Sequence, residues 1–152
     1  MGSMTGTWPA DGSRVLLDTM ALIYFLERHP RYGVIARRIF QRIEAGEITA
    51  LVSSLIFAEL LVPLYRRGDL QSVRGLQNRL RNFRHLRVQD LTADISAEAA
   101  RLRAQYGLRT PDAIHGATAL AGGADGILTN DTGLTRLRAE NLGIWRFDEY
   151  VP

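Results

Sequence analysis

The chain has 152 residues, of which 46% are hydrophobic, and its 19 basic and 16 acidic side chains give a net charge of +3. This length and apolar content are typical of one compact domain with a single core, and they exclude disorder as the main state. The chain has no run of about 18 apolar residues, which excludes a membrane span, and no cysteine, which excludes disulfides and thiolate metal sites.

The first thirteen residues are rich in glycine, serine and threonine and show no periodicity. We therefore expect residues 1–13 to be disordered or derived from an expression tag, and a single domain to span residues 14–152. No basic segment followed by an apolar run begins the chain, so we expect no secretory signal and a cytoplasmic location.

The first expected element is a buried strand over Arg14 to Asp18, a short apolar run that ends in an acid. Helices are expected over residues 19–26 and, after a proline break, over residues 33–45, where isoleucines recur at a spacing of four. A second strand over residues 47–53 follows.

In the middle of the chain, Ser54 is expected to cap a helix that bends or ends near Pro63. Thr110 is expected to cap a later helix, with Pro111 in its first turn and a stop at Gly122. The other expected elements are helices over about 70–84, 95–106 and 134–139, and strands over 85–88, 126–129 and 143–147. Short strands that alternate with helices predict an α/β fold, a three-layer α/β/α sandwich around a parallel sheet of about five strands.

Four carboxylates occupy corresponding places in this alternation. Asp18 ends the first strand and Asp131 follows the strand over residues 126–129, whereas Glu59 and Asp112 lie in the first turns of helices. The carboxyl ends of parallel strands share one edge, and ligands bind there at the point where the strand order reverses, so we expect the four acids to converge. Each acid alone is better explained as a helix cap, a solvated helix position or a turn residue; the set of four favours a site.

Such a cluster has to raise its pKa values or bind a cation, because two carboxylates roughly 4 Å apart near a protein surface repel by about 4 kcal/mol. Oxygen ligands without histidine or cysteine favour Mg²⁺ or Mn²⁺ over zinc. All basic residues other than histidine are arginines, which pair with phosphate through a planar fork. The combination indicates metal-assisted hydrolysis of a polyanion, with the metal activating a water.

Four runs that contain these acids resemble the acidic motifs of PIN-domain nucleases. They are VLLDT at residues 15–19, SSLIFAEL at 53–60, TPDAIHGATA at 110–119 and ILTND at 127–131. More narrowly, the chain resembles the VapC ribonuclease toxins of bacterial toxin–antitoxin pairs, over about residues 14–145. The third and fourth motifs are the most specific.

The resemblance implies a parallel five-stranded sheet between helices and Mg²⁺- or Mn²⁺-dependent endonucleolytic cleavage of RNA. It also implies a homodimer and a small antitoxin protein whose tail enters the groove near the acids. Carried over by motif, the metal and catalytic carboxylates would be Asp18, Glu59, Asp112 and Asp131.

Three further residues are implied as supports of this site. Thr19 and Thr129 would hydrogen-bond within it, and Asn130 would orient Asp131, although Asn130 is equally explained as a turn residue. Met20 departs from the family pattern, in which a small polar residue is usual, so hydrogen bonding at that position is not expected.

A run of arginines interrupted by a single acid, Asp69, is the second candidate site. Those expected to contact RNA or the antitoxin are Arg66, Arg67, Arg74, Arg79, Arg81 and Arg84, with Arg87 just beyond. Phosphate contacts of this kind are sensitive to salt. The alternative is an ordinary solvated helix face.

Other side chains suggest weaker possibilities. His115 shares a helix face with Asp112 but is more typical of a packed histidine, and the three histidines form no acid–base pair. Trp145, Phe147 and Tyr150 are more typical of core than of base-stacking residues. The apolar residues 22–26 suggest a dimer surface.

The sequence excludes two other enzyme classes and leaves two alternatives to a nuclease toxin. A haloacid dehalogenase-type phosphotransferase needs a second aspartate at position 20, which is Met20, and no P-loop motif is present. Two alternatives remain open. One is a PIN-domain nuclease that processes RNA without an antitoxin, and the other is an inactive PIN-fold module that binds RNA or protein.

Overall fold

The computed structural model describes residues 8–150 of the chain. Five parallel strands form one sheet in the order β3–β2–β1–β4–β5. They are β1 (Arg14–Leu17), β2 (Thr49–Ser53), β3 (Leu86–Gln89), β4 (Gly126–Thr129) and β5 (Gly143–Arg146). The strand order reverses at β1, which lies between β2 and β4, so the segments that follow β1 and β4 leave the sheet side by side.

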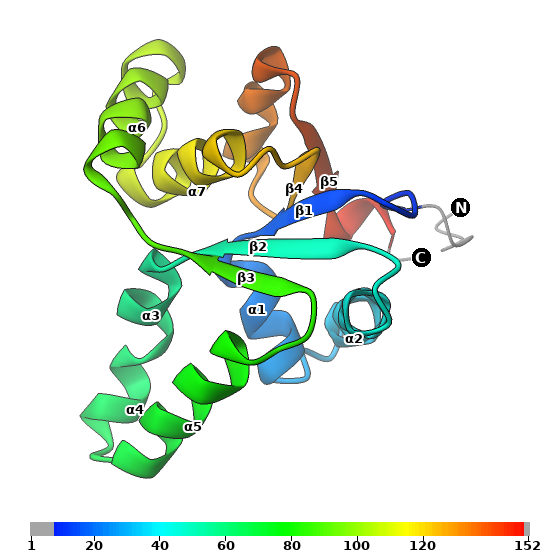
Figure 1. Ribbon diagram of the computed structural model, residues 1–152, viewed down its shortest axis with the longest axis vertical. Coiled ribbons are helices and arrows are strands. Elements are labelled where there is room, and N and C mark those ends of the chain that lie inside the picture. Colours follow the sequence, from blue (N-terminus) through cyan, green and yellow to red (C-terminus); the bar gives the residue numbers. More distant parts are fainter. Residues whose placement is uncertain (1–7, 151–152) are drawn as a thin grey trace.

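Helices cover both faces of this sheet (Figure 1). They are α1 (Thr19–Leu26), α2 (Gly33–Glu44), α3 (Leu55–Leu60), α4 (Val62–Arg66), α5 (Leu70–Arg81), α6 (Ala93–Tyr106), α7 (Thr110–Ala121), and the 3₁₀ helices η1 (Thr132–Glu140) and η2 (Phe147–Glu149). Helices α1 and α2 lie on one face and α6 and α7 on the other, while α3, α4 and α5 form an arm that projects beside α1 (Figure 1). The predicted three-layer fold is confirmed.

The alternation of side chains along β1 explains why both faces need a cover. Val15 and Leu17 belong to the core cluster beneath α1 and α2, whereas Leu16 belongs to the cluster beneath α6 and α7. All three are fully buried. A strand that is apolar on both faces is stable only at the centre of a covered parallel sheet, which is where β1 lies.

The structure describes residues 8–13, which precede the predicted start of the domain at residue 14. Residues 1–7 lie outside the described part, but Trp8 is buried, and its ring centroid lies 3.4 Å from that of Tyr150 and 6.4 Å from that of Phe147. Trp8 therefore covers the end of the α1–α2 core, and the domain includes at least residues 8–13. An apolar side chain within a glycine-rich stretch was the missed signal.

Two predicted helix caps are wrong. Ser54 precedes α3, but its hydroxyl accepts a hydrogen bond from the Leu91 amide and not from its own helix. The hydroxyl of Ser53 instead accepts from the Leu55 amide. Thr110 is the first residue of α7, so the cap position belongs to Arg109. The Arg109 side chain makes no capping hydrogen bond to the helix.

Some boundaries and one helix type also differ from the predictions. The basic helix α5 ends at Arg81, and the chain turns at His85, which has a left-handed φ of 62°. The segment expected to be helical over 134–139 is the longer 3₁₀ helix η1.

The apolar stretch at residues 22–26 is used largely inside the molecule. Leu22 and Tyr24 are buried, and the ring of Phe25 stacks on Phe40 at 3.9 Å. This packing within the domain accounts for the apolar character of residues 22–26, so these residues do not require a dimer surface. Phe147 is fully buried, in agreement with a core role. No helix within residues 8–150 is long and apolar enough to cross a membrane.

Candidate functional site

The end of β1 and the end of β4 are joined by a buried contact between Asp18 and Thr129. The Thr129 hydroxyl donates a hydrogen bond to Asp18 Oδ2, and the Ala21 amide in the first turn of α1 donates to Oδ1 at 3.0 Å. Asp18 is only 4% exposed. Burial raises the pKa of this carboxyl, and the nearby His115 and the Thr129 hydrogen bond oppose that effect.

Asp131 lies two residues beyond the end of β4, in the turn that follows this strand, and backbone contacts fix its side chain. Its Oδ1 accepts from the Gly133 amide at 2.8 Å, and its own amide donates to Thr129 Oγ1 at 2.9 Å. Thr129 thus links Asp18 to the segment that carries Asp131. Asn130 points elsewhere: its amide group donates to the Tyr24 hydroxyl at 3.3 Å, and its oxygen accepts from the Asp148 amide. It braces the β4 turn against α1 and η2.

Glu59 reaches the same edge from α3 through Thr19. The Thr19 hydroxyl donates to Glu59 Oε1 at 2.6 Å, and His115 Nε2 lies 3.3 Å from the same hydroxyl. Because the Thr19 hydroxyl donates its only proton to Glu59, it can only accept a hydrogen bond from His115 Nε2. His115 and the Thr19 hydroxyl hold the pKa of Glu59 below its usual value.

His115 is buried, as expected of a packed histidine, but it packs against the acids. It is 3% exposed, and its Nε2 lies 3.7 Å from Glu59 Oε1, which is too long for a hydrogen bond. Its Nδ1 has no hydrogen-bond partner within the described residues. The ring therefore supports Thr19 and Glu59 from beneath.

Asp112 and Asp131 share one guanidinium. Arg109 Nε donates to Asp112 Oδ2 and Arg109 Nη2 donates to Asp131 Oδ2, both at 3.0 Å. Burial raises the pKa of Asp112, the charge of Asp131 raises it further, and Arg109 lowers it. Because both carboxylates contact the same guanidinium, the two acids are close enough to repel each other.

The four acids lie in two hydrogen-bonded groups, which the peptide bond between Asp18 and Thr19 joins, but they do not form a closed cage. Thr129 and Arg109 link Asp18, Asp131 and Asp112, whereas Thr19 and His115 hold Glu59. The two groups together are called the acid network below. Among residues 8–150, no three histidine, aspartate or glutamate side chains lie near enough to enclose a metal ion. The oxygens that face this edge are hard donors of the type that Mg²⁺ and Mn²⁺ prefer.

The predicted arginine surface divides into two groups. The guanidinium of Arg79 lies 5.2 Å from the Phe25 ring centroid, and that of Arg81 lies 5.4 Å from the Phe57 centroid, so both cover apolar side chains of the core. All six arginines are exposed, and four of them contact no aromatic ring within residues 8–150: Arg66, Arg67 and Arg74 on the arm, and Arg84 just after α5. The salt bridges found within residues 8–150 include none of the six.

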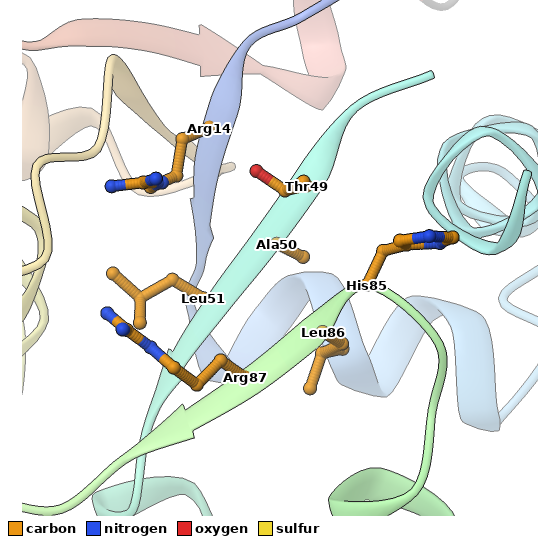
Figure 2. A pocket seen from close by; sticks show the side chains of 7 residues that line it. All are labelled: Arg14, Thr49, Ala50, Leu51, His85, Leu86 and Arg87. Carbon is orange, nitrogen blue, oxygen red and sulfur yellow. The ribbon is translucent and has the colours of Figure 1, made fainter. Parts of the chain in front are cut away.

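A basic cavity of about 280 Å³ lies near the start of the strands, away from the acids. Figure 2 shows Arg14 and Arg87 on the same side of the sheet, flanking Leu51. No carboxylate lines this cavity; its lining residues are Arg14, Thr49, Ala50, Leu51, His85, Leu86 and Arg87. It lacks the acids that metal-assisted hydrolysis needs.

The sequence-based prediction missed Arg109 and underrated His115. Arg109 stands just before the Thr-Pro-Asp motif, so its spacing of three residues from Asp112 was a usable signal. Its contact with Asp131 was not, because it depends on how α7 packs beside β4.

Comparisons with known proteins agree with this geometry. A family model described as PIN domain matches residues 15–140, and no curated protein is significantly similar to the chain. A structure of VapBC2 from Rickettsia felis bound to a promoter DNA fragment is 18% identical, with a TM-score of 0.66 over 88% of this chain and 98% of the matched chain.

Two other solved structures are similar. A toxin–antitoxin complex from Klebsiella pneumoniae is 25% identical, with a TM-score of 0.56 over 78% of this chain and 87% of the matched one. The Sarcin-Ricin loop cleaving toxin VapC20 from Mycobacterium tuberculosis is 18% identical, with a TM-score of 0.64 over 91% and 99% of the two chains.

Replacement of Thr129 by valine tests the link between Asp18 and Asp131. Thr129→Val leaves a buried carboxylate oxygen and the Asp131 amide without their partner, so we expect a loss of about 1–3 kcal/mol in the free energy of unfolding. Urea unfolding measures it. Thr118→Val is the matched control, because Thr118 is also fully buried but bonds only to the Ile114 carbonyl in its own helix. An equal loss in both variants would contradict the link.

Replacement of Asp18 by asparagine tests the burial of its charge. Because the folded-state pKa of Asp18 lies above its unfolded value, the ionised carboxyl costs stability at neutral pH, and this cost disappears as the pH falls through the folded pKa. We expect Asp18→Asn to have the higher melting temperature at pH 7, with the difference shrinking toward acidic pH. Thermal unfolding of both proteins in EDTA measures this. A variant less stable than the wild type at pH 7 would refute the argument.

Proposed function

Because the chain belongs to the PIN domain family, we propose that it is a metal-dependent endoribonuclease and the toxin of a toxin–antitoxin pair. The observation that carries the proposal is the acid network at the carboxyl edge. Thr129 and Arg109 link Asp18, Asp131 and Asp112, and Thr19, the neighbour of Asp18 in the chain, holds Glu59. Asp18, Glu59, Asp112 and Asp131 are the proposed catalytic carboxylates.

The donor set fits Mg²⁺ or Mn²⁺. Mg²⁺ keeps several waters and is typically held by one or two carboxylates together with substrate phosphate, so a closed protein cage is not required. The adjacent pair Asp112 and Asp131 would supply direct ligands, and Asp18 and Glu59 would complete the set. When bound, the metal would activate a water and neutralise charge on the scissile phosphate.

The protein's own residues would orient these acids. Thr129 and the Ala21 amide fix the Asp18 carboxylate, and the Gly133 amide fixes that of Asp131. Thr19, supported by His115, keeps Glu59 ionised and pointed at the edge. Fixed oxygens lower the reorganisation that catalysis costs.

The exposed arginines of the arm are the proposed RNA contacts. Arg66, Arg67, Arg74 and Arg84 have no salt-bridge partner within residues 8–150 and belong to the segment that follows α3, which carries Glu59. A polyanion held there would extend from the acidic edge. Arg79 and Arg81 would contribute less to RNA binding, because their guanidinium groups pack over the rings of Phe25 and Phe57.

A protein partner is proposed because the similar structures include VapBC and other toxin–antitoxin complexes. An apolar groove between α1 and the arm provides a surface for it, with a volume of about 290 Å³. Its apolar lining residues are Ile23, Leu26, Leu60, Pro63, Leu64 and Leu76. A homodimer is part of the proposal, through exposed apolar side chains such as Tyr65 and Leu70.

Cleavage of RNA by the purified protein tests the enzymatic proposal. Addition of Mn²⁺ or Mg²⁺ should produce endonucleolytic fragments, EDTA should prevent them, and Asp112→Asn should lower the rate by about 100-fold or more. Gel analysis of structured and single-stranded RNAs measures it. Asp94→Asn is the control, because Asp94 lies on α6 and is no member of the network. If the wild type with metal binds RNA but leaves it intact, the inactive module is the better description.

Growth of a bacterial host tests the toxin proposal. Expression of the wild type should arrest growth and Asp112→Asn should not, because arrest would follow from RNA cleavage. Co-expression of the short gene that neighbours this one, if it encodes a DNA-binding protein, should restore growth. RNA cleavage in vitro without growth arrest would favour a processing nuclease without an antitoxin.

A further inference from the structure

Arg109 holds the two most closely coupled acids of the site with one edge of its guanidinium. Nε and Nη2 each donate over 3.0 Å, the first to Asp112 and the second to Asp131. The other N–H groups, on Nη1 and the far side of Nη2, are left for another acceptor. The side chain of Arg109 is 76% exposed, whereas those of Asp112 and Asp131 are 13% and 26% exposed.

Arg109 is the movable member of this trio. Asp131 is held by the Gly133 amide, and Asp112 is part of helix α7. Arg109 precedes the helix with an extended backbone and makes no capping bond to it. Within residues 8–150 its guanidinium forms salt bridges only with these two acids. A change in what the two carboxylates bind therefore moves Arg109 before it moves the acids.

The electrostatic reason for the contact is the repulsion between Asp112 and Asp131. Burial and the charge of Asp131 raise the pKa of Asp112, and Arg109 opposes both effects. A guanidinium stays protonated at every physiological pH, so the charge compensation by Arg109 does not depend on pH. A divalent cation that takes the same carboxylate oxygens offers more charge, but it has to replace both contacts of Arg109.

We propose that Arg109 is a built-in counter-cation that competes with the divalent metal for Asp112 and Asp131, and that once displaced it binds a phosphate of the RNA. This inference rests on the metal dependence of the proposed function. One side chain would then stabilise the acidic pair before metal and substrate arrive, and would contribute positive charge to the substrate afterwards. Metal loading and phosphate binding would be coupled through Arg109.

The test compares Mn²⁺ affinity and RNA affinity in Arg109→Gln, Arg109→Lys and the wild type. We expect Arg109→Gln to bind Mn²⁺ about tenfold more tightly, a coupling ordinary for two linked ligands, while its affinity for RNA falls. Arg109→Lys keeps the charge without the fork and should lie between the two. Electron paramagnetic resonance of free Mn²⁺ measures the first affinity, and fluorescence anisotropy of a labelled RNA measures the second.

Arg37→Gln is the matched control. It removes the same charge from an exposed position on α2 that has no salt bridge within the described residues. Its Mn²⁺ affinity should equal that of the wild type. In EDTA, Arg109→Gln should melt at a lower temperature than Arg37→Gln, and Mn²⁺ should raise its melting temperature more, because the metal replaces the missing counter-cation.

Each outcome decides between the inferences. Unchanged or weaker Mn²⁺ binding by Arg109→Gln, in a protein whose wild type cleaves RNA with Mn²⁺, overturns the counter-cation and leaves the proposed nuclease intact. If neither the wild type nor any variant binds Mn²⁺, the metal dependence and the competition fall together. Should Arg109→Gln fail to fold, Arg109→Lys must still bind Mn²⁺ more tightly than the wild type for the inference to stand.

Discussion

The crowding of negative charge where β1 and β4 end side by side is the constraint on which the rest of this site depends. The parallel pairing of Leu17 with Leu128 brings Asp18 next to Thr129, and the turn that follows carries Asp131. Carboxylates gathered in partly buried surroundings are costly unless each one has a donor or a cation. The surrounding residues supply those donors one by one.

The compensation differs from acid to acid, and the difference suggests a division of roles. Asp18 is satisfied by an amide and a hydroxyl, and burial still raises its pKa. Glu59 is more exposed and its pKa is lowered by His115 and Thr19. Asp112 and Asp131 depend on a side chain, Arg109, that is itself exposed to solvent. The first two are fixed by the fold, whereas the last two keep a replaceable cation.

The net charge of +3 conceals a strong separation of charge. The acids lie at one edge of the sheet, and exposed arginines lie along the arm formed by α3, α4 and α5 (Figure 1). An acidic edge alone repels a polyanion, and an arginine surface alone binds it without chemistry. The fold joins the two because Glu59 on α3 belongs to the network and the same helix leads into the arm. Arg79 and Arg81 show that part of this positive surface also covers the core.

Apolar periodicity was sufficient to predict the layers and the parallel sheet. The position of each acid, after a strand or at a helix start, was sufficient to predict that the four acids meet at one edge, because every parallel strand ends on the same side. Local pattern failed where a side chain had a distant partner. Ser54 bonds to Leu91 instead of capping its helix, and Trp8 packs on Tyr150. The same reason applies to the site: Thr129 meets Asp18 across 111 residues and Thr19 meets His115 across 96. The sequence by itself determined which carboxylates are proposed for the site, whereas only the tertiary structure decided which donors and which cation contact them, since such contacts depend on packing between distant elements.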